Sequence, residues 1–145
     1  MEAALCNVTQ VQGKAGLVSV GDLIKHNTFV GLYFSAHWCA PCRGFTPKLI
    51  EFYNTMKAND QPIEIIFVSY DRDQDHFDNF YCEMPWHAIP YSDEDKRDEL
   101  ADKYDVKGIP YLVIMDSQGT IIDKEGRGTV QTDCGTEIPG KWRKT

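Results

Sequence analysis

Two cysteines separated by two residues, Cys39 and Cys42, stand at the start of a segment whose pattern predicts a helix. Residues three apart on a helix lie on neighbouring turns, so the two sulfur atoms come close enough to form a disulfide. Free backbone N–H groups and the helix dipole favour a thiolate at Cys39. This thiolate can attack a disulfide, and Cys42 can then attack the resulting mixed disulfide. The spacing therefore predicts a redox pair with Cys39 as nucleophile and Cys42 as resolving thiol.

The neighbours of the pair fit this chemistry. Trp38 can cover the sulfur atoms with an aromatic surface, and Pro41 stiffens the turn because it fixes φ and removes one donor. The alternative is half of a structural zinc site, which needs four ligands and usually two such pairs. The chain has a single Cys-x-x-Cys pair, and its 4 histidines show no ligand spacing. We therefore expect neither a metal nor a cofactor.

Size and charge exclude several classes of protein. A length of 145 residues predicts one domain, residues 1–145, with a core of about residues 17–130 and an irregular C-terminal tail. The 15 basic and 22 acidic residues give a net charge of −7, which argues against nucleic-acid binding. Neither a membrane span nor a signal peptide is visible. We expect a monomer in a reducing compartment, the cytoplasm or also the nucleus.

Strands and helices alternate along the chain. Apolar, β-rich runs predict buried strands at residues 28–34, 63–69 and 111–115. Apolar side chains at helical spacing predict helices at residues 45–56, 75–84 and 100–104, the first kinked by Pro47. Ser117-Gln118-Gly119 predicts a turn that leads into a paired last strand. The order predicts an α/β fold with a central, mixed, mostly parallel sheet and helices on both faces.

Three segments carry a resemblance to a known family. Residues 38–49 (WCAPCRGFTPKL), 84–91 (MPWHAIPY) and 104–110 (YDVKGIP) resemble the tryparedoxin and nucleoredoxin branch of the thioredoxin superfamily. Together they span most of residues 29–125 at the right intervals. The resemblance implies a thioredoxin-like fold. It also implies a dithiol carrier that reduces protein disulfides.

In this branch electrons come from a low-molecular-weight thiol, such as trypanothione or glutathione, or from a reductase. They pass to oxidised proteins such as peroxidases. The alternative implied by the nucleoredoxins is a redox-regulated interaction module that holds a signalling partner and turns over little. Both alternatives need the two cysteines.

The resemblance also implies roles for residues distant from the pair. An X-Pro bond is ordinarily trans, but here Ile109-Pro110 resembles the cis-proline loop that faces the sulfurs and pairs with an extended substrate. Asp71 resembles an acidic residue that exchanges protons with Cys42; the alternative is a helix cap. Arg127 resembles a residue that meets the donor's carboxylate; the alternative is a plain surface arginine. The implied substrate-binding set is Trp38, Pro41, Ile109, Pro110 and Arg127.

The remaining positions of interest depart from ordinary thioredoxins or lie outside the pair. Tyr33 stands six residues before Cys39, where thioredoxins carry a buried acid. The thioredoxin proton relay is therefore expected to be absent. Cys82 is expected as a small packed side chain in a helix, and Cys6 and Cys134 are expected to be of little consequence.

Overall fold

In the computed structural model, which describes residues 1–143, the strand that leads to the cysteines is β3 (Phe29–Ser35). It lies inside a seven-stranded sheet with the order β2-β1-β5-β4-β3-β6-β7. Its neighbours are β4 (Ile63–Ser69), which is parallel to it, and β6 (Tyr111–Met115), which is antiparallel. The other strands are β1 (Gln10–Gly13), β2 (Gly16–Ser19), β5 (His87–Ala88) and β7 (Ile121–Asp123).

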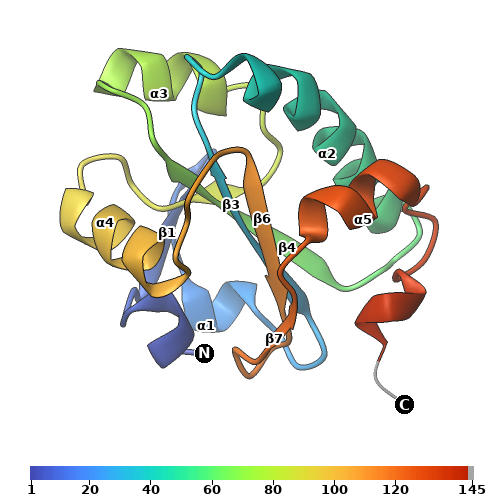
Figure 1. The fold of residues 1–145 in the computed structure, drawn as a ribbon. Helices are drawn as coiled ribbons and strands as arrows, with labels where there is room; N and C mark the ends of the chain where they lie inside the picture. Colours follow the sequence, from blue (N-terminus) through green and yellow to red (C-terminus); the bar gives the residue numbers. More distant parts are fainter. Residues whose placement is uncertain (144–145) are drawn as a thin grey trace.

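Helices cover both faces of this sheet (Figure 1). On one face, α2 (Ala40–Ala58), α3 (Gln74–Tyr81) and α5 (Gly126–Thr132) bury side chains against a core centred on Tyr33 and Phe67. On the other, the short turn η1 (Ala3–Leu5), α1 (Val20–Leu23) and α4 (Glu94–Lys103) cover a second core around Leu32. Within residues 1–143, every helix is too short or too polar to cross a membrane. The α/β fold with helices on both faces is thus as predicted.

One part of the fold prediction is wrong, because parallel pairing is confined to β3–β4 and β4–β5. The other pairs in the described chain are antiparallel, including the β6–β7 hairpin that was predicted and the β1–β2 hairpin that was not. A parallel pair needs a long crossover, which α2 and α3 provide. The hairpins added at the edges need only short turns, so the sheet is mixed rather than mostly parallel.

Buried side chains also lie outside residues 17–130. Leu5 and Val11 are fully buried before residue 17, and Trp142 is 1% exposed beyond residue 130. The Trp142 ring packs against Phe29 and Phe52, with centroids 6.0 and 5.9 Å away. The C-terminal tail is therefore anchored by the ring of Trp142, which is buried between the start of β3 and α2.

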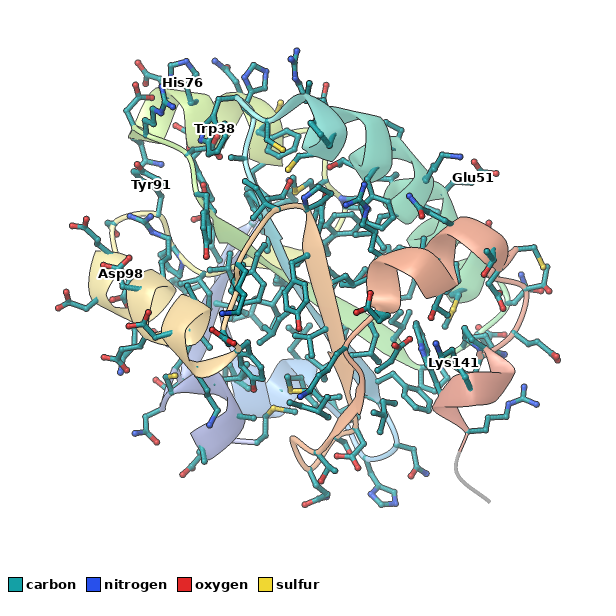
Figure 2. All side chains as sticks on the ribbon, in the orientation of Figure 1. Trp38, Glu51, His76, Tyr91, Asp98 and Lys141 are labelled. Carbon is teal, nitrogen blue, oxygen red and sulfur yellow. The ribbon has the colours of Figure 1, made fainter. Side chains whose placement is uncertain are left out.

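A buried carboxylate anchors this tail. Asp123 Oδ2 accepts hydrogen bonds from Trp142 Nε1 (2.8 Å) and from the Thr129 hydroxyl (2.6 Å). Lys141, labelled in Figure 2, approaches the other oxygen of Asp123 to 3.7 Å. This tail is carried by the short turn η2 (Gly140–Trp142). Trp142 thus belongs to the core, whereas Lys141 and Arg143 on either side of it are exposed.

Candidate active site

Cys39 and Cys42 meet where β3 passes into α2. Cys39 is the N-cap residue of α2, and its Sγ accepts a hydrogen bond from the Cys42 backbone N–H at 3.3 Å. Both thiols are free. Cys39 keeps 7% of its surface exposed, whereas Cys42 is completely buried. Only Cys39 is open to a reactant from solvent, which is the arrangement that a nucleophile and a resolving thiol require.

The electrostatic environment separates the two thiols further. Burial raises the pKa of Cys42 to about 12, and the neighbouring Cys39 side chain adds to the effect. The backbone N–H that points at Cys39 Sγ stabilises negative charge on that sulfur instead. At neutral pH, Cys42 therefore stays a thiol, whereas the sulfur of Cys39 lies against a backbone donor.

Tyr33 occupies the position where an ordinary thioredoxin has its acid. Its hydroxyl lies 2.6 Å from Thr46 Oγ1, and the Thr46 hydroxyl donates to the Cys42 carbonyl at 2.8 Å. Because the Thr46 proton is used in that bond, Tyr33 is the donor to Thr46. Burial raises the pKa of Tyr33 to about 12, so this chain of groups stays uncharged. It fixes the first turn of α2 without a carboxylate.

The predicted cis bond between Ile109 and Pro110 is present. It places the Ile109 carbonyl oxygen 3.7 Å from Cys39 Sγ, although the two residues lie 70 positions apart. Pro110 is buried and Ile109 is partly exposed. The loop thus faces the nucleophile, and Ile109 presents backbone next to it.

Trp38 forms an open platform beside Cys39. The residue is 47% exposed, and its Nε1 donates to the Tyr70 carbonyl at 2.9 Å. The Arg72 guanidinium lies 5.2 Å from the ring centroid. Figure 2 shows Trp38 near the end of α3 that carries His76. Pro41 is exposed in the first turn of α2. A flat, partly apolar surface therefore borders the sulfur atoms.

Asp71 lies just after β4, at the end of the sheet where the cysteine pair stands, and its carboxylate is hydrogen-bonded to groups other than the cysteines. Its carboxylate accepts a hydrogen bond from the His37 backbone N–H and another from the Ser69 hydroxyl, both at 2.7 Å. These bonds tie the segment before Cys39 to the end of β4. The alternative that Asp71 caps the next helix is wrong, because Asp73 is the N-cap of α3. Proton exchange with Cys42 stays a prediction, and the contacts support a positioning role.

Arg127 lies in the first turn of α5 and is half-buried. Within residues 1–143, the contacts that the structure describes do not join its guanidinium to either cysteine. Sequence reasoning found no helix there, because α5 holds two glycines and only one large apolar residue, Val130. A role in binding a carboxylate stays a prediction.

One cysteine outside the pair, Cys82, and two buried hydroxyls beside the pair differ from what the sequence indicates. Cys82 is exposed rather than packed, because α3 ends at Tyr81. Sequence reasoning missed Thr46 and Ser35, which lie at the pair. Thr46 stands four residues after Cys42, the spacing at which a hydroxyl reaches back to a helix carbonyl. Ser35 follows Tyr33 by two residues and shares its face of β3.

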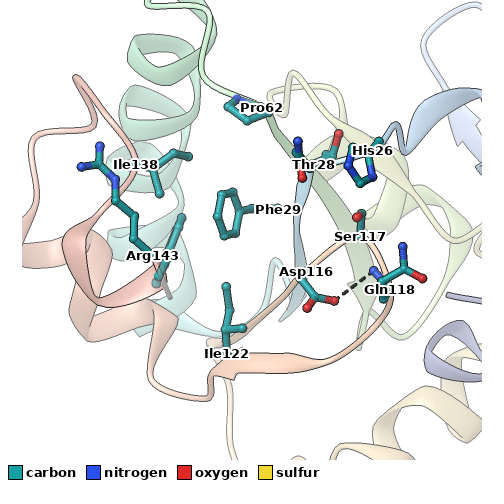
Figure 3. A pocket seen from close by; sticks show the side chains of 12 residues that line it. His26, Thr28, Phe29, Pro62, Asp116, Ser117, Gln118, Ile122, Ile138 and Arg143 are labelled. Atoms are coloured by element: carbon teal, nitrogen blue, oxygen red, sulfur yellow. Dashed lines mark hydrogen bonds between the residues drawn. The ribbon is translucent and has the colours of Figure 1, made fainter. Parts of the chain in front are cut away.

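A cavity of about 620 Å³ lies elsewhere on the molecule (Figure 3). It is lined by Phe29, at the start of β3, and by Ile122, Ile138 and Trp142. Cys39 comes shortly after Ser35, the last residue of β3, whereas Phe29 is the first. The cavity and the pair therefore lie at opposite ends of that strand. None of the predicted site residues lines it. Within residues 1–143, no group of three or more His, Cys, Asp or Glu side chains could hold a metal ion.

Known proteins resemble this chain in sequence and in fold. Residues 27–121 match the thioredoxin-like family. Nucleoredoxin of Bos taurus is 50% identical over 104 residues, which are 72% of this chain and 24% of nucleoredoxin. Tryparedoxin of Trypanosoma brucei brucei is 38% identical over 130 residues, 89% of this chain and 88% of tryparedoxin. The structure of tryparedoxin II complexed with glutathionylspermidine gives a TM-score of 0.84 at 34% identity and covers 91% of each chain.

The two kinds of relative differ in extent. The chain spans about a quarter of the length of the nucleoredoxins that it matches, but nearly the whole of the tryparedoxin. The match to the thioredoxin-like family covers more than half of the chain, and it includes both cysteines and the cis-proline loop. The chain therefore belongs to the thioredoxin-like oxidoreductase family and, within it, to the branch of the tryparedoxins and nucleoredoxins.

Proposed function

We propose that this chain reduces protein disulfides through Cys39 and Cys42. The observation that carries the proposal is the unequal burial of the two cysteine residues at the start of α2, opposite the Ile109–Pro110 loop. A single cysteine open to solvent and a second one sealed behind it allow a two-step exchange. A pair of equally exposed thiols would not impose that order.

The reaction follows from this geometry. The Cys39 thiolate attacks one sulfur of the substrate disulfide, and the other substrate sulfur leaves with the bonding electrons and takes a proton from solvent. Cys42 then loses its proton to solvent and attacks Cys39 Sγ. This step forms the Cys39–Cys42 disulfide and breaks the bond to the substrate, whose second sulfur leaves as a thiolate and is protonated. Two electrons pass from the pair to the substrate.

The surface around Cys39 suits an extended protein segment. The exposed ring of Trp38 offers apolar contact, and the backbone of Ile109 lies beside the sulfur. Pro41 borders the same opening. We propose that Trp38, Pro41, Ile109 and Pro110 hold the residues next to the substrate disulfide. Peroxidases are among the oxidised proteins that we propose as substrates.

A glutathione-type thiol is the proposed electron donor, with a protein reductase as the other candidate. The support is that the structurally similar tryparedoxin II forms a complex with glutathionylspermidine. We propose that Arg127 contacts a carboxylate of such a donor. Arg127→Ala should then raise the KM for glutathione or trypanothione and leave the reaction of Cys39 with iodoacetamide unchanged. An unchanged KM would mean that Arg127 is a plain surface arginine.

The second candidate function is a redox-regulated interaction module with little turnover. The exposed Trp38 platform and the similarity to nucleoredoxin favour it. For either function, we propose a single thioredoxin-like domain that acts as a monomer. We place it in a reducing compartment, the cytoplasm or also the nucleus.

Reduction of insulin disulfides separates the two functions. Glutathione, trypanothione, and a thioredoxin reductase with NADPH are supplied in parallel as reductants. We expect turnover with at least one, loss of turnover in Cys42→Ser, and a trapped mixed disulfide in that variant. Cys82→Ser, which removes an exposed thiol outside the pair, is the matched control and should be as active as wild type. No turnover with any donor, together with partner binding that persists in a Cys39→Ser/Cys42→Ser protein, would favour the interaction module.

A further inference from the structure

Ser35, the last residue of β3, has a buried hydroxyl with no assigned purpose. The residue is completely buried, and within residues 1–143 its Oγ has no hydrogen-bond partner of ordinary geometry. Its backbone is fixed, because its carbonyl accepts a bond from the Tyr70 N–H at 2.9 Å. Leaving a buried hydroxyl unpaired costs free energy, so such a group calls for a physical reason.

The position of Ser35 points to Cys42. Side chains alternate along a strand, so Ser35 and Tyr33 share the face of β3 that α2 covers. Burial raises the pKa of the Cys42 thiol to about 12, and Ser35 is the neighbouring side chain that acts in the opposite direction. Its hydroxyl therefore lies beside both the Tyr33 hydroxyl and the Cys42 sulfur, where it can donate to a negative charge on that sulfur.

Three other polar side chains at this end of the sheet are already occupied. The Tyr33 hydroxyl donates to Thr46, and the Thr46 hydroxyl donates to the Cys42 carbonyl. The Asp71 carboxylate accepts bonds from His37 and Ser69. Among these side chains, Ser35 is the one with a free donor. A thiol sulfur accepts hydrogen bonds weakly, whereas a thiolate accepts them strongly.

We propose that the Ser35 hydroxyl donates a hydrogen bond to the Cys42 sulfur as that sulfur becomes a thiolate, and so accelerates the resolving step. The hydroxyl keeps its own proton throughout. The proton of Cys42 goes to solvent, the new bond joins Cys42 to Cys39, and the electron pair of the broken bond leaves with the second substrate sulfur. The hydroxyl is unpaired in the resting protein because its partner forms only during the reaction. This inference rests on the proposed dithiol function.

Ellman's reagent tests the proposal, because it reports both steps without a physiological donor. Attack by Cys39 releases one thionitrobenzoate at a rate that depends on reagent concentration. Resolution by Cys42 releases a second at a rate that does not. In Ser35→Ala the second rate constant should fall about tenfold to a hundredfold, while the first stays within about twofold of the wild-type value. Peptide mass spectrometry of the product separates these events from the reaction of Cys6, Cys82 and Cys134.

Ser69→Ala is the matched control. Ser69 is paired with Ser35 in the β3–β4 register and is 1% exposed, but its hydroxyl bonds to Asp71. This variant should leave the ratio of the two rate constants unchanged. An unchanged ratio in Ser35→Ala, or the same change in both variants, would overturn the inference. Ser35→Gly, which also lacks the hydroxyl, gives the same readout if the alanine variant does not fold. A wild-type protein that never releases the second equivalent would instead refute the proposed function.

Discussion

The difference in ionisation between Cys42 and an ordinary thiol leads to a quantitative prediction. Burial raises the pKa of Cys42 from 9.0 to about 12. Each pH unit is a factor of ten in ionisation, so at pH 7 Cys42 carries about a thousandth of the thiolate of an ordinary cysteine. Exposed Cys134 is the internal reference, because hydrogen bonds from Thr136 lower its pKa. Since iodoacetamide reacts with thiolates, Cys42 should be labelled at least about a thousandfold more slowly than Cys134.

The assay is time-resolved labelling at pH 7, with each cysteine followed by peptide mass spectrometry. The Cys39→Ser variant is used so that labelling of Cys39 does not interfere, and it keeps burial, the largest cause of the raised pKa of Cys42, in place. In 6 M guanidinium chloride, about the usual denaturing concentration, Cys42 and Cys134 should react at similar rates, which shows that the protection belongs to the fold. Labelling of Cys42 in the folded protein within about tenfold of Cys134 would refute the argument that burial separates the two thiols of the pair.

Three further predictions concern the tail and Asp71. Trp142→Ala removes a ring that is 1% exposed and should lower the free energy of unfolding by about 3–5 kcal/mol in a urea titration; a loss below about 1 kcal/mol would mean that the tail is not part of the core. Burial raises the pKa of Asp123, but hydrogen bonds from Thr129 and Trp142 outweigh this, so the pKa is lowered. The ionised Asp123 therefore contributes its full stabilisation of the fold at a pH above its unfolded pKa of about 3.9, and this contribution is lost as the pH falls through its lower pKa in the folded protein. The Trp142→Phe variant lacks the indole N–H and should lose less stability than wild type over that pH interval. Asp71→Ala should slow both thionitrobenzoate phases, whereas Asp71→Asn, which keeps one acceptor oxygen, should stay nearer to wild type; an equal and selective loss of the second phase in both variants would favour proton exchange with Cys42.

Local signals made the redox pair predictable. The signals are local: a β-rich run, a Cys-x-x-Cys spacing and an apolar helix face. All three lie within residues 28–58, which therefore suffice to predict β3 and α2. The cis bond at Pro110 followed from the resemblance and not from the turn itself. Cys39 and Ile109 come together only because β6 returns beside β3.

The parts that were missed depend on contacts between distant residues. Trp142 is buried because Phe29, Phe52 and Asp123 form a site for it, and nothing within the basic tail itself indicates that site. The β1–β2 hairpin was missed because its strands have four residues each and little apolar alternation. Asp71 was assigned to Cys42 or to a helix cap because both are local or familial roles. One contact that the sequence did not indicate is the bond from the His37 N–H, 34 residues earlier in the chain.

The absence of an acid at position 33 changes how this pair must work. A buried carboxylate near Cys42 could accept its proton, but it would also place a negative charge beside the thiolate that has to form. Tyr33 and Thr46 avoid that repulsion, since they stay neutral and only hold the helix turn. The charge of the Cys42 thiolate then has to be met by a neutral donor. Ser35 is the buried hydroxyl still free to do so, which is why the resolving step, and not the first attack, should be sensitive to its removal.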